Sequence, residues 1–195
     1  MIARAWILVG AVLLLMAGEA SAHPVFGITG VRGGLLHPLV VPSHVMSAMA
    51  LAILIGRQPL GQAMVAVYAL GLVAGLCAIA AAYVPTLAEE ALLLLAAIAG
   101  LLVAWGRPLP WVVVAPLAAA AGLAIGLDSP PEAISIAEAN LTLIGTALSG
   151  TAFLAVLALL ASRLRRDWQR IGLRIAGSWI SASAIMVLAL RFAGG

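Results

Sequence analysis

Two of the chain's three histidines, His37 and His44, lie seven residues apart in a segment that is otherwise almost entirely apolar. Seven residues make about two helical turns, so both imidazoles would lie on roughly the same face of a helix. Pro42 lies between them. Proline donates no backbone N–H and its ring clashes with the preceding turn, so we expect the helix to kink or unwind there. Ser43 and Ser47 continue the polar strip.

This pair of histidines predicts transient binding of a cation. Neutral imidazole is a good ligand for nickel, copper, zinc or iron. Ionisable groups inside a membrane span usually face the interior of the bundle or an aqueous path. The alternative is that one or both histidines only hydrogen-bond a neighbouring helix.

The third histidine, His23, follows a segment with the features of a secretory signal peptide. Residues 1–22 combine Arg4 near the start, a short apolar run and a small-residue cleavage site that ends at Ala22. We predict cleavage there, and the alternative is an uncleaved first helix. A mature chain beginning at His23 could chelate a metal ion with its α-amino nitrogen and imidazole together. Alternatively, His23 only marks a tolerated cleavage site.

The composition indicates that lipid, not water, surrounds the elements that position these residues. Of 195 residues, 65% are hydrophobic and 9% are charged, and the mean hydropathy is +1.20. The net charge of +3 comes from scattered arginines without any lysine, so we assign it to membrane topology and expect no nucleic-acid partner. The single cysteine, Cys77, is expected to be a small packing residue.

We predict an all-α polytopic membrane helix bundle, with a cleaved signal peptide and about six transmembrane helices in a single domain, residues 23–195. Most of the expected spans approach the length needed to cross a bilayer, and the third and fourth are short. The spans are Gly34–Gly56, Leu60–Tyr83, Ala91–Gly106, Trp111–Leu127, Ala139–Ala161 and Ile171–Phe192. Two G-x-x-x-G pairs, in the second and fourth spans, predict close packing of helices within the bundle.

The charges between the spans predict an orientation. If the signal peptide is cleaved, the inner connections hold most of the arginines, and the outer connections hold the carboxylates apart from Asp167. Arg32 and Arg191 are the outer exceptions among the arginines. We therefore expect a bacterial inner-membrane protein whose mature N-terminus and C-terminus are both periplasmic.

The stretch GLLHPLVVPSHVMSAMA, which begins at Gly34, resembles the first mature span of the HupE/UreJ family. That span reads approximately H-P-L-x-G-x-D-H-x-x-A-M. His37, Pro38, Leu39 and His44 match it, and Ser43 stands where the family has aspartate. The family consists of small bacterial membrane proteins regarded as nickel or cobalt permeases, and its plan of a cleaved signal followed by about six spans fits the whole chain.

A second family motif, F-H-G-x-A-H-G-x-E, corresponds to Ala124–Glu132. Glu132 and a glycine match, whereas Ile125 and Ser129 replace the two histidines. Asp128 is a possible substitute oxygen ligand. This chain has fewer nitrogen ligands than the family motif, which suggests a weaker site, a different cation or no metal.

The resemblance implies secondary transport of a divalent transition-metal cation, nickel or cobalt first. The sequence has no Walker motif, so we expect no ATP hydrolysis. No nucleophile paired with a base is apparent beyond scattered serines near His44, so we expect no enzyme. Ni²⁺ or Co²⁺ would bind only transiently and no resident cofactor is expected. The metal residues would be His23, His37 and His44, with support from Pro42, Ser43, Asp128 and Glu132. The alternative is a non-transporting accessory subunit that packs against a membrane enzyme, or supplies metal to one. Such a protein could also form a homo-oligomer.

Overall fold

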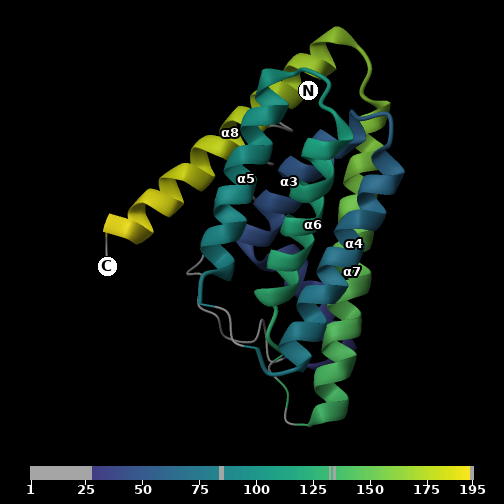
Figure 1. The fold of residues 1–195 in the computed structure, drawn as a ribbon, viewed down its shortest axis with the longest axis vertical. Coiled ribbons are helices and arrows are strands. Elements are labelled where there is room, and N and C mark those ends of the chain that lie inside the picture. The colour runs from purple at the N-terminus through teal and green to yellow at the C-terminus, as the bar shows by residue number, and fades with distance from the viewer. Residues whose placement is uncertain (1–27, 84–85, 132, 134, 194–195) are drawn as a thin grey trace, which may run out of the picture.

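The computed structural model describes residues 28–83, 86–131, 133 and 135–193, and every regular element among them is a helix (Figure 1). The predicted all-α fold is confirmed. The proposed signal peptide lies outside the described residues. The helices are α2 (Gly30–Val40), α3 (Pro42–Gly56), α4 (Gly61–Ala80), α5 (Ala88–Trp105), α6 (Trp111–Leu127), α7 (Ile136–Arg163) and α8 (Asp167–Ala193).

Each of the six predicted apolar segments appears as a helix or as a pair of half-helices. Four helices are long and apolar enough to cross a membrane, namely α4, α5, α7 and α8. The first predicted span is broken into α2 and α3, which are bent by 67°, and α6 is a shorter apolar helix of 17 residues. The helices α7 and α8 extend beyond the predicted apolar ranges, because the helical backbone continues into polar residues at both ends of α7 and at the start of α8.

The helices α4 and α6 pack side by side through their glycines. A Cβ atom on Gly122 would lie 2.1 Å from the carbonyl oxygen of Tyr68, and one on Gly75 would lie 2.4 Å from that of Leu123. Gly71 and Gly126 make equally close approaches. The predicted close packing within the bundle is confirmed. The structure further shows that the two G-x-x-x-G pairs face each other, which lets the two backbones meet without intervening side chains.

Glycines also bring α7 against the broken span. A Cβ atom on Gly34 of α2 would lie within 1.9 Å of the Thr142 carbonyl oxygen, and one on Gly56 of α3 within 2.3 Å of the Ala158 carbonyl oxygen. These contacts follow α7 in chain order, so α2 and α3 run along it in the same direction. The helices α5 and α8 are antiparallel, with Gly177 beside Gly100.

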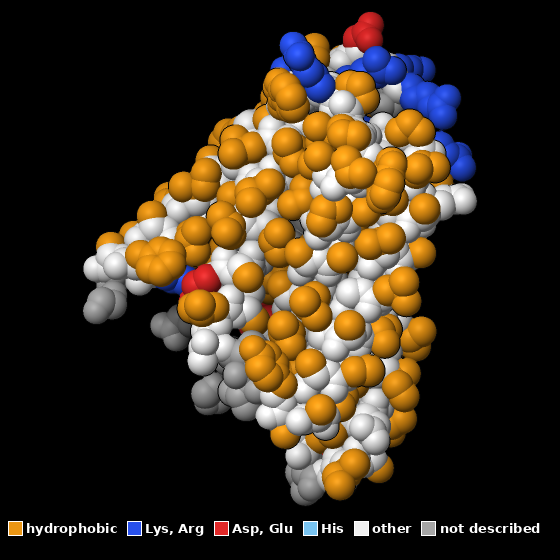
Figure 2. All heavy atoms as spheres, viewed as in Figure 1, with side chains coloured by type: hydrophobic (Ala, Val, Ile, Leu, Met, Phe, Trp, Pro, Cys, Tyr) orange, Lys and Arg blue, Asp and Glu red, His pale blue; other side chains and the backbone are white. Residues whose placement is uncertain are grey.

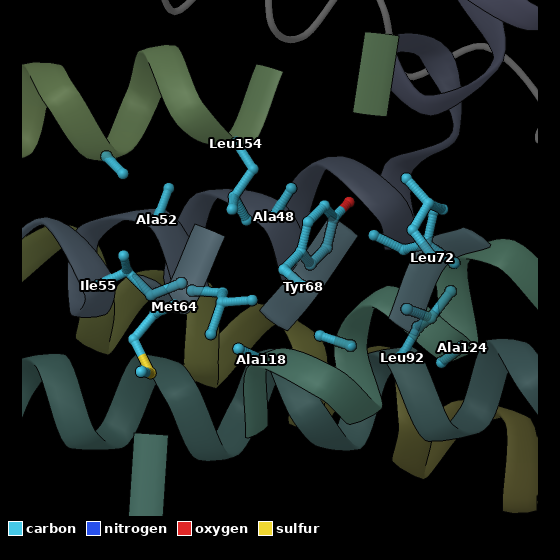
Figure 3. Packing of buried hydrophobic residues seen from close by; sticks show 14 of the residues in the cluster. Ala48, Ala52, Ile55, Met64, Tyr68, Leu72, Leu92, Ala118, Ala124 and Leu154 are labelled. Atoms are coloured by element: carbon cyan, nitrogen blue, oxygen red, sulfur yellow. The ribbon is translucent and has the colours of Figure 1, made fainter. Parts of the chain in front are cut away.

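Large apolar side chains fill the centre of the bundle, and many others cover its outside. Figure 3 shows Tyr68, Leu72 and Leu154 among the buried residues of the largest cluster. Leu70 and Trp179, in contrast, are each 72% exposed. The apolar outer surface in Figure 2 is typical of a protein that lipid surrounds.

Opposite charges collect at opposite ends of the bundle. The end where α3, α5 and α7 finish, here called the arginine end, holds the arginines gathered in Figure 2. The other, acidic end holds Glu89, Glu90, Asp128 and Glu138. Arg191, an exception in the sequence pattern, forms ion pairs with Glu89 and Glu90 at this end. Its charge is thus compensated locally.

Candidate functional site at the break between α2 and α3

The break in the first span follows from Pro42. Val41 is extended (φ −79°, ψ 116°), as expected for a residue that precedes proline. The α2 helix ends with the Val41 N–H donating to the His37 carbonyl oxygen at 3.3 Å. Pro42 then begins α3, a position where its missing N–H costs nothing. The predicted kink is confirmed, and the helical backbone is interrupted at Val41, which is extended.

The break brings the two histidines together. His37 lies in the last turn of α2 and His44 in the first turn of α3. Their ring centroids are 5.2 Å apart, and the planes meet at 71°. Seven-residue spacing predicted both rings on roughly the same helical face with a kink between them. In the structure the two rings meet across the bend.

Asp128 at the end of α6 holds both imidazoles. The Nε2 atom of His44 lies 2.9 Å from Oδ2 of Asp128, and the Nε2 atom of His37 lies 3.4 Å from the Asp128 carbonyl oxygen. Both oxygens only accept, so each Nε2 must carry the proton. His44 is fully buried, whereas the Asp128 side chain is 25% exposed. The carboxylate thus lies between the buried histidine and the outside of the protein.

Two imidazoles and one carboxylate offer nitrogen and oxygen ligands of the kinds that divalent transition metals accept. In the structure both Nε2 atoms are occupied by hydrogen bonds to Asp128. The described residues contain no group of three or more His, Cys, Asp or Glu side chains that could hold a metal ion. The arrangement is a closed hydrogen-bonded cluster that would have to rearrange to bind a cation.

Several buried polar atoms beside this cluster lack partners in the described part of the chain. They are the hydroxyls of Ser43 and Ser47 and the Nδ1 atom of His44. An unsatisfied polar group away from water costs about 1–3 kcal/mol. The inward polar strip expected from the sequence is present, and its donors and acceptors are available to a ligand or to water.

Tyr68 was missed by the sequence argument. Its side chain is fully buried and its hydroxyl has no partner among the described residues. The hydroxyl lies beside Gly150 of α7, close to where Pro38 of α2 also packs. The sequence did contain a feature that could have indicated it, since Tyr68 is one of only two tyrosines and lies in the middle of an apolar span.

Other polar side chains stabilise the surrounding helices. Ser129, which replaces a family histidine, donates to the Ile125 carbonyl oxygen at 2.6 Å. Ser149 of α7 donates to the Gly34 carbonyl oxygen at 3.3 Å and ties α7 to α2. Of the remaining predicted site residues, His23 and Glu132 lie outside the described residues.

A bundle of apolar helices with a broken span and ionisable groups at the break is an integral membrane protein with a polar interior site. Residues 11–187 match the family described as HupE / UreJ protein. The chain belongs to this family, as its sequence motifs indicated. No curated protein and no solved structure shows significant similarity to it.

Proposed function

We propose that this chain is a secondary transporter of a divalent transition-metal cation, nickel or cobalt first, without ATP hydrolysis or any enzymatic activity. The observation that carries the proposal is the meeting of His37, His44 and Asp128 at a helix break. Broken helices in transporters commonly form the substrate site. The cation is the cargo and binds only transiently.

The proposed path starts at the acidic end. Asp128, with His23, Glu132 and Glu138, would concentrate cations electrostatically. His37 and His44 would then take the cation from Asp128 and pass it inward. In this orientation the acidic end and both mature termini are periplasmic, the arginine end is cytoplasmic, and the membrane is the bacterial inner membrane.

The test is uptake of radiolabelled nickel and cobalt by cells that lack their own importers. We expect His44→Ala to reduce uptake more than His23→Ala, because water cannot replace a ligand lost at the fully buried His44 position. Ser181→Ala is the matched control, since Ser181 is also buried but bonds to Ala97 of α5. Equal uptake by wild type, His44→Ala and an empty vector, also with copper and zinc, would reject transport.

A non-transporting accessory subunit is the second candidate. The observation that favours it is the closed state of the cluster, in which Asp128 satisfies the Nε2 atoms of both histidines. In that case the two histidines would fix α6 against the broken span. Such a subunit should co-purify with a membrane metalloenzyme, and His44→Ala should weaken that association without affecting cation uptake.

A further inference from the structure

Three arginines lie at the arginine end, far from the histidine cluster. Arg57 caps the end of α3, and Arg170 and Arg174 lie one turn apart near the start of α8. Leu54, one turn before Arg57, belongs to an apolar cluster on which Leu173 packs. The start of α8, which carries the other two arginines, therefore packs against the end of α3 that carries Arg57.

These charges have no counter-ion among the described residues. No described carboxylate lies within ion-pair distance of any of the three arginines, although Asp167 is in the first turn of α8. The Nη1 atom of Arg57 is buried without a hydrogen-bond partner. Burial and, after it, repulsion from Arg170 and Arg174 lower the pKa of Arg57. The cluster therefore lacks a nearby negative charge.

Tryptophans indicate the depth of this cluster. Trp105, Trp111 and Trp168 all lie at the arginine end and are more than half exposed. The guanidinium of Arg107 lies 5.3 Å from the ring centroid of Trp105. Exposed tryptophans gather where lipid headgroups meet the hydrocarbon. The arginines accordingly lie at headgroup level.

An open cavity of about 270 Å³ adjoins Arg174. Its lining joins two polar side chains, Arg174 and Ser178, to the apolar Ala104, Ile171 and Ile175. Arg174 donates from Nε to the Ala104 carbonyl oxygen at 2.8 Å, which fixes the guanidinium at the cavity edge. A cavity whose lining combines a guanidinium with apolar side chains suits an amphiphile.

We propose that this cavity binds an anionic phospholipid. The guanidinium group of Arg174, at the cavity edge, holds the phosphate, since guanidinium matches the geometry of phosphate oxygens with parallel hydrogen bonds. The charges of Arg57 and Arg170 at the same end of the bundle add attraction for an anionic headgroup. Ile171 and Ile175 contact the first part of an acyl chain. Basic pockets between helices bind such headgroups in other membrane proteins. The site is independent of the proposed transport activity.

The test compares two triple variants of the full chain, purified in detergent. One removes the site, with Arg57→Gln, Arg170→Gln and Arg174→Gln. The matched control removes three charges from the same end, with Arg163→Gln, Arg165→Gln and Arg166→Gln. Retained lipid is measured by native mass spectrometry. The thermal midpoint is measured with phosphatidylglycerol, phosphatidylcholine or inorganic phosphate added.

We expect wild type and control to retain phosphatidylglycerol and to be stabilised by it over phosphatidylcholine. The site variant should lose affinity by about fivefold for each arginine removed. Equal loss in both triple variants, or no retained lipid in wild type, would overturn the proposal. Equal stabilisation by inorganic phosphate would indicate a free-anion site instead. If the site triple variant fails to fold, single substitutions of exposed residues replace it in the same assay. Arg170→Glu should then lose phosphatidylglycerol and Arg163→Glu should retain it, and equal retention would overturn the proposal.

Discussion

Asp128 is the residue on which the candidate site depends, because it accepts from His44 with its carboxylate and from His37 with its carbonyl oxygen. The negative charge of Asp128 can therefore be tested separately from its hydrogen bonds. A substitution that removes the negative charge but keeps a side-chain oxygen leaves both hydrogen bonds possible.

We therefore expect Asp128→Asn to fold normally but to bind the cation more weakly by about tenfold or more, the lower bound found for loss of an outer-shell partner. Isothermal titration with nickel and cobalt measures the affinity. Asp167→Asn, at the exposed start of α8, is the control for loss of one carboxylate. Unchanged affinity in Asp128→Asn would remove Asp128 from the cation path.

Ser43→Asp introduces beside His44 the carboxylate that the HupE/UreJ family motif has at this position. Ser43 is buried and its hydroxyl has no partner in the described residues, so an unpaired carboxylate there costs several kcal/mol. We expect a lower thermal midpoint without metal, recovered when nickel is added, and tighter cation binding with slower release. A midpoint that does not respond to nickel would contradict a cation site at this position.

At the scale of the element, the break is fixed by a single residue, and this could be predicted. Proline acts through local sterics, so Pro42 and the extended Val41 need no tertiary information. The contact of both histidines with Asp128 depends on how α6 packs against the broken span. Motif correspondence indicated Asp128 as a possible ligand, but residue spacing could not show that its backbone carbonyl also takes part.

Pro42→Ala should let α2 and α3 join, because alanine supplies the missing N–H and removes the ring clash. Straightening would separate His37 from its present partners, and we expect uptake to fall to about the level of His44→Ala. The control is Pro116→Ala, since Pro116 lies exposed within the unbroken helix α6. Hydrogen exchange of the residues around Val41 would report the restored helix. Wild-type uptake in Pro42→Ala would show that the break is unnecessary.

The glycine contact between α4 and α6 gives a prediction about stability. A methyl group on Gly122 meets backbone atoms of α4 that cannot move aside, so Gly122→Ala should destabilise the bundle by about 1–3 kcal/mol or more. Gly172→Ala in α8 is the control, because nothing lies within 4 Å of its added Cβ. Thermal unfolding in detergent measures both. Equal midpoints would mean that the two backbones are farther apart than described.

At the scale of the whole molecule, the orientation can be measured with single cysteines in a Cys77→Ala background. Ser135→Cys at the start of α7 lies at the acidic end, and Ser162→Cys lies at its other end. We expect a membrane-impermeant maleimide to label Ser135→Cys in intact spheroplasts and Ser162→Cys only after lysis. The reverse pattern would invert the proposed topology.

Hydropathy, prolines and arginines predicted the helical class, the apolar segments and the gathering of charge at two ends, because these depend on how each segment meets lipid. Sequence spacing could not reveal the partnering of helices. Tyr68 shows the reason, since its hydroxyl matters only once α4 lies beside α7 and α2. The ion pairs of Arg191 likewise join the end of α8 to the start of α5.

The close backbone contact between α4 and α6 also has a mechanical consequence. Two helices interlocked through glycines at this distance slide past each other only with difficulty, so they behave as one rigid body. The broken span is fastened to α7 through Gly34 and Gly56 in the same manner. Asp128 ends α6, whereas both histidines belong to the broken span. The two hydrogen bonds at Asp128 therefore join one glycine-packed pair of helices to the other, and a displacement of the end of α6 away from the break would free both imidazoles at once.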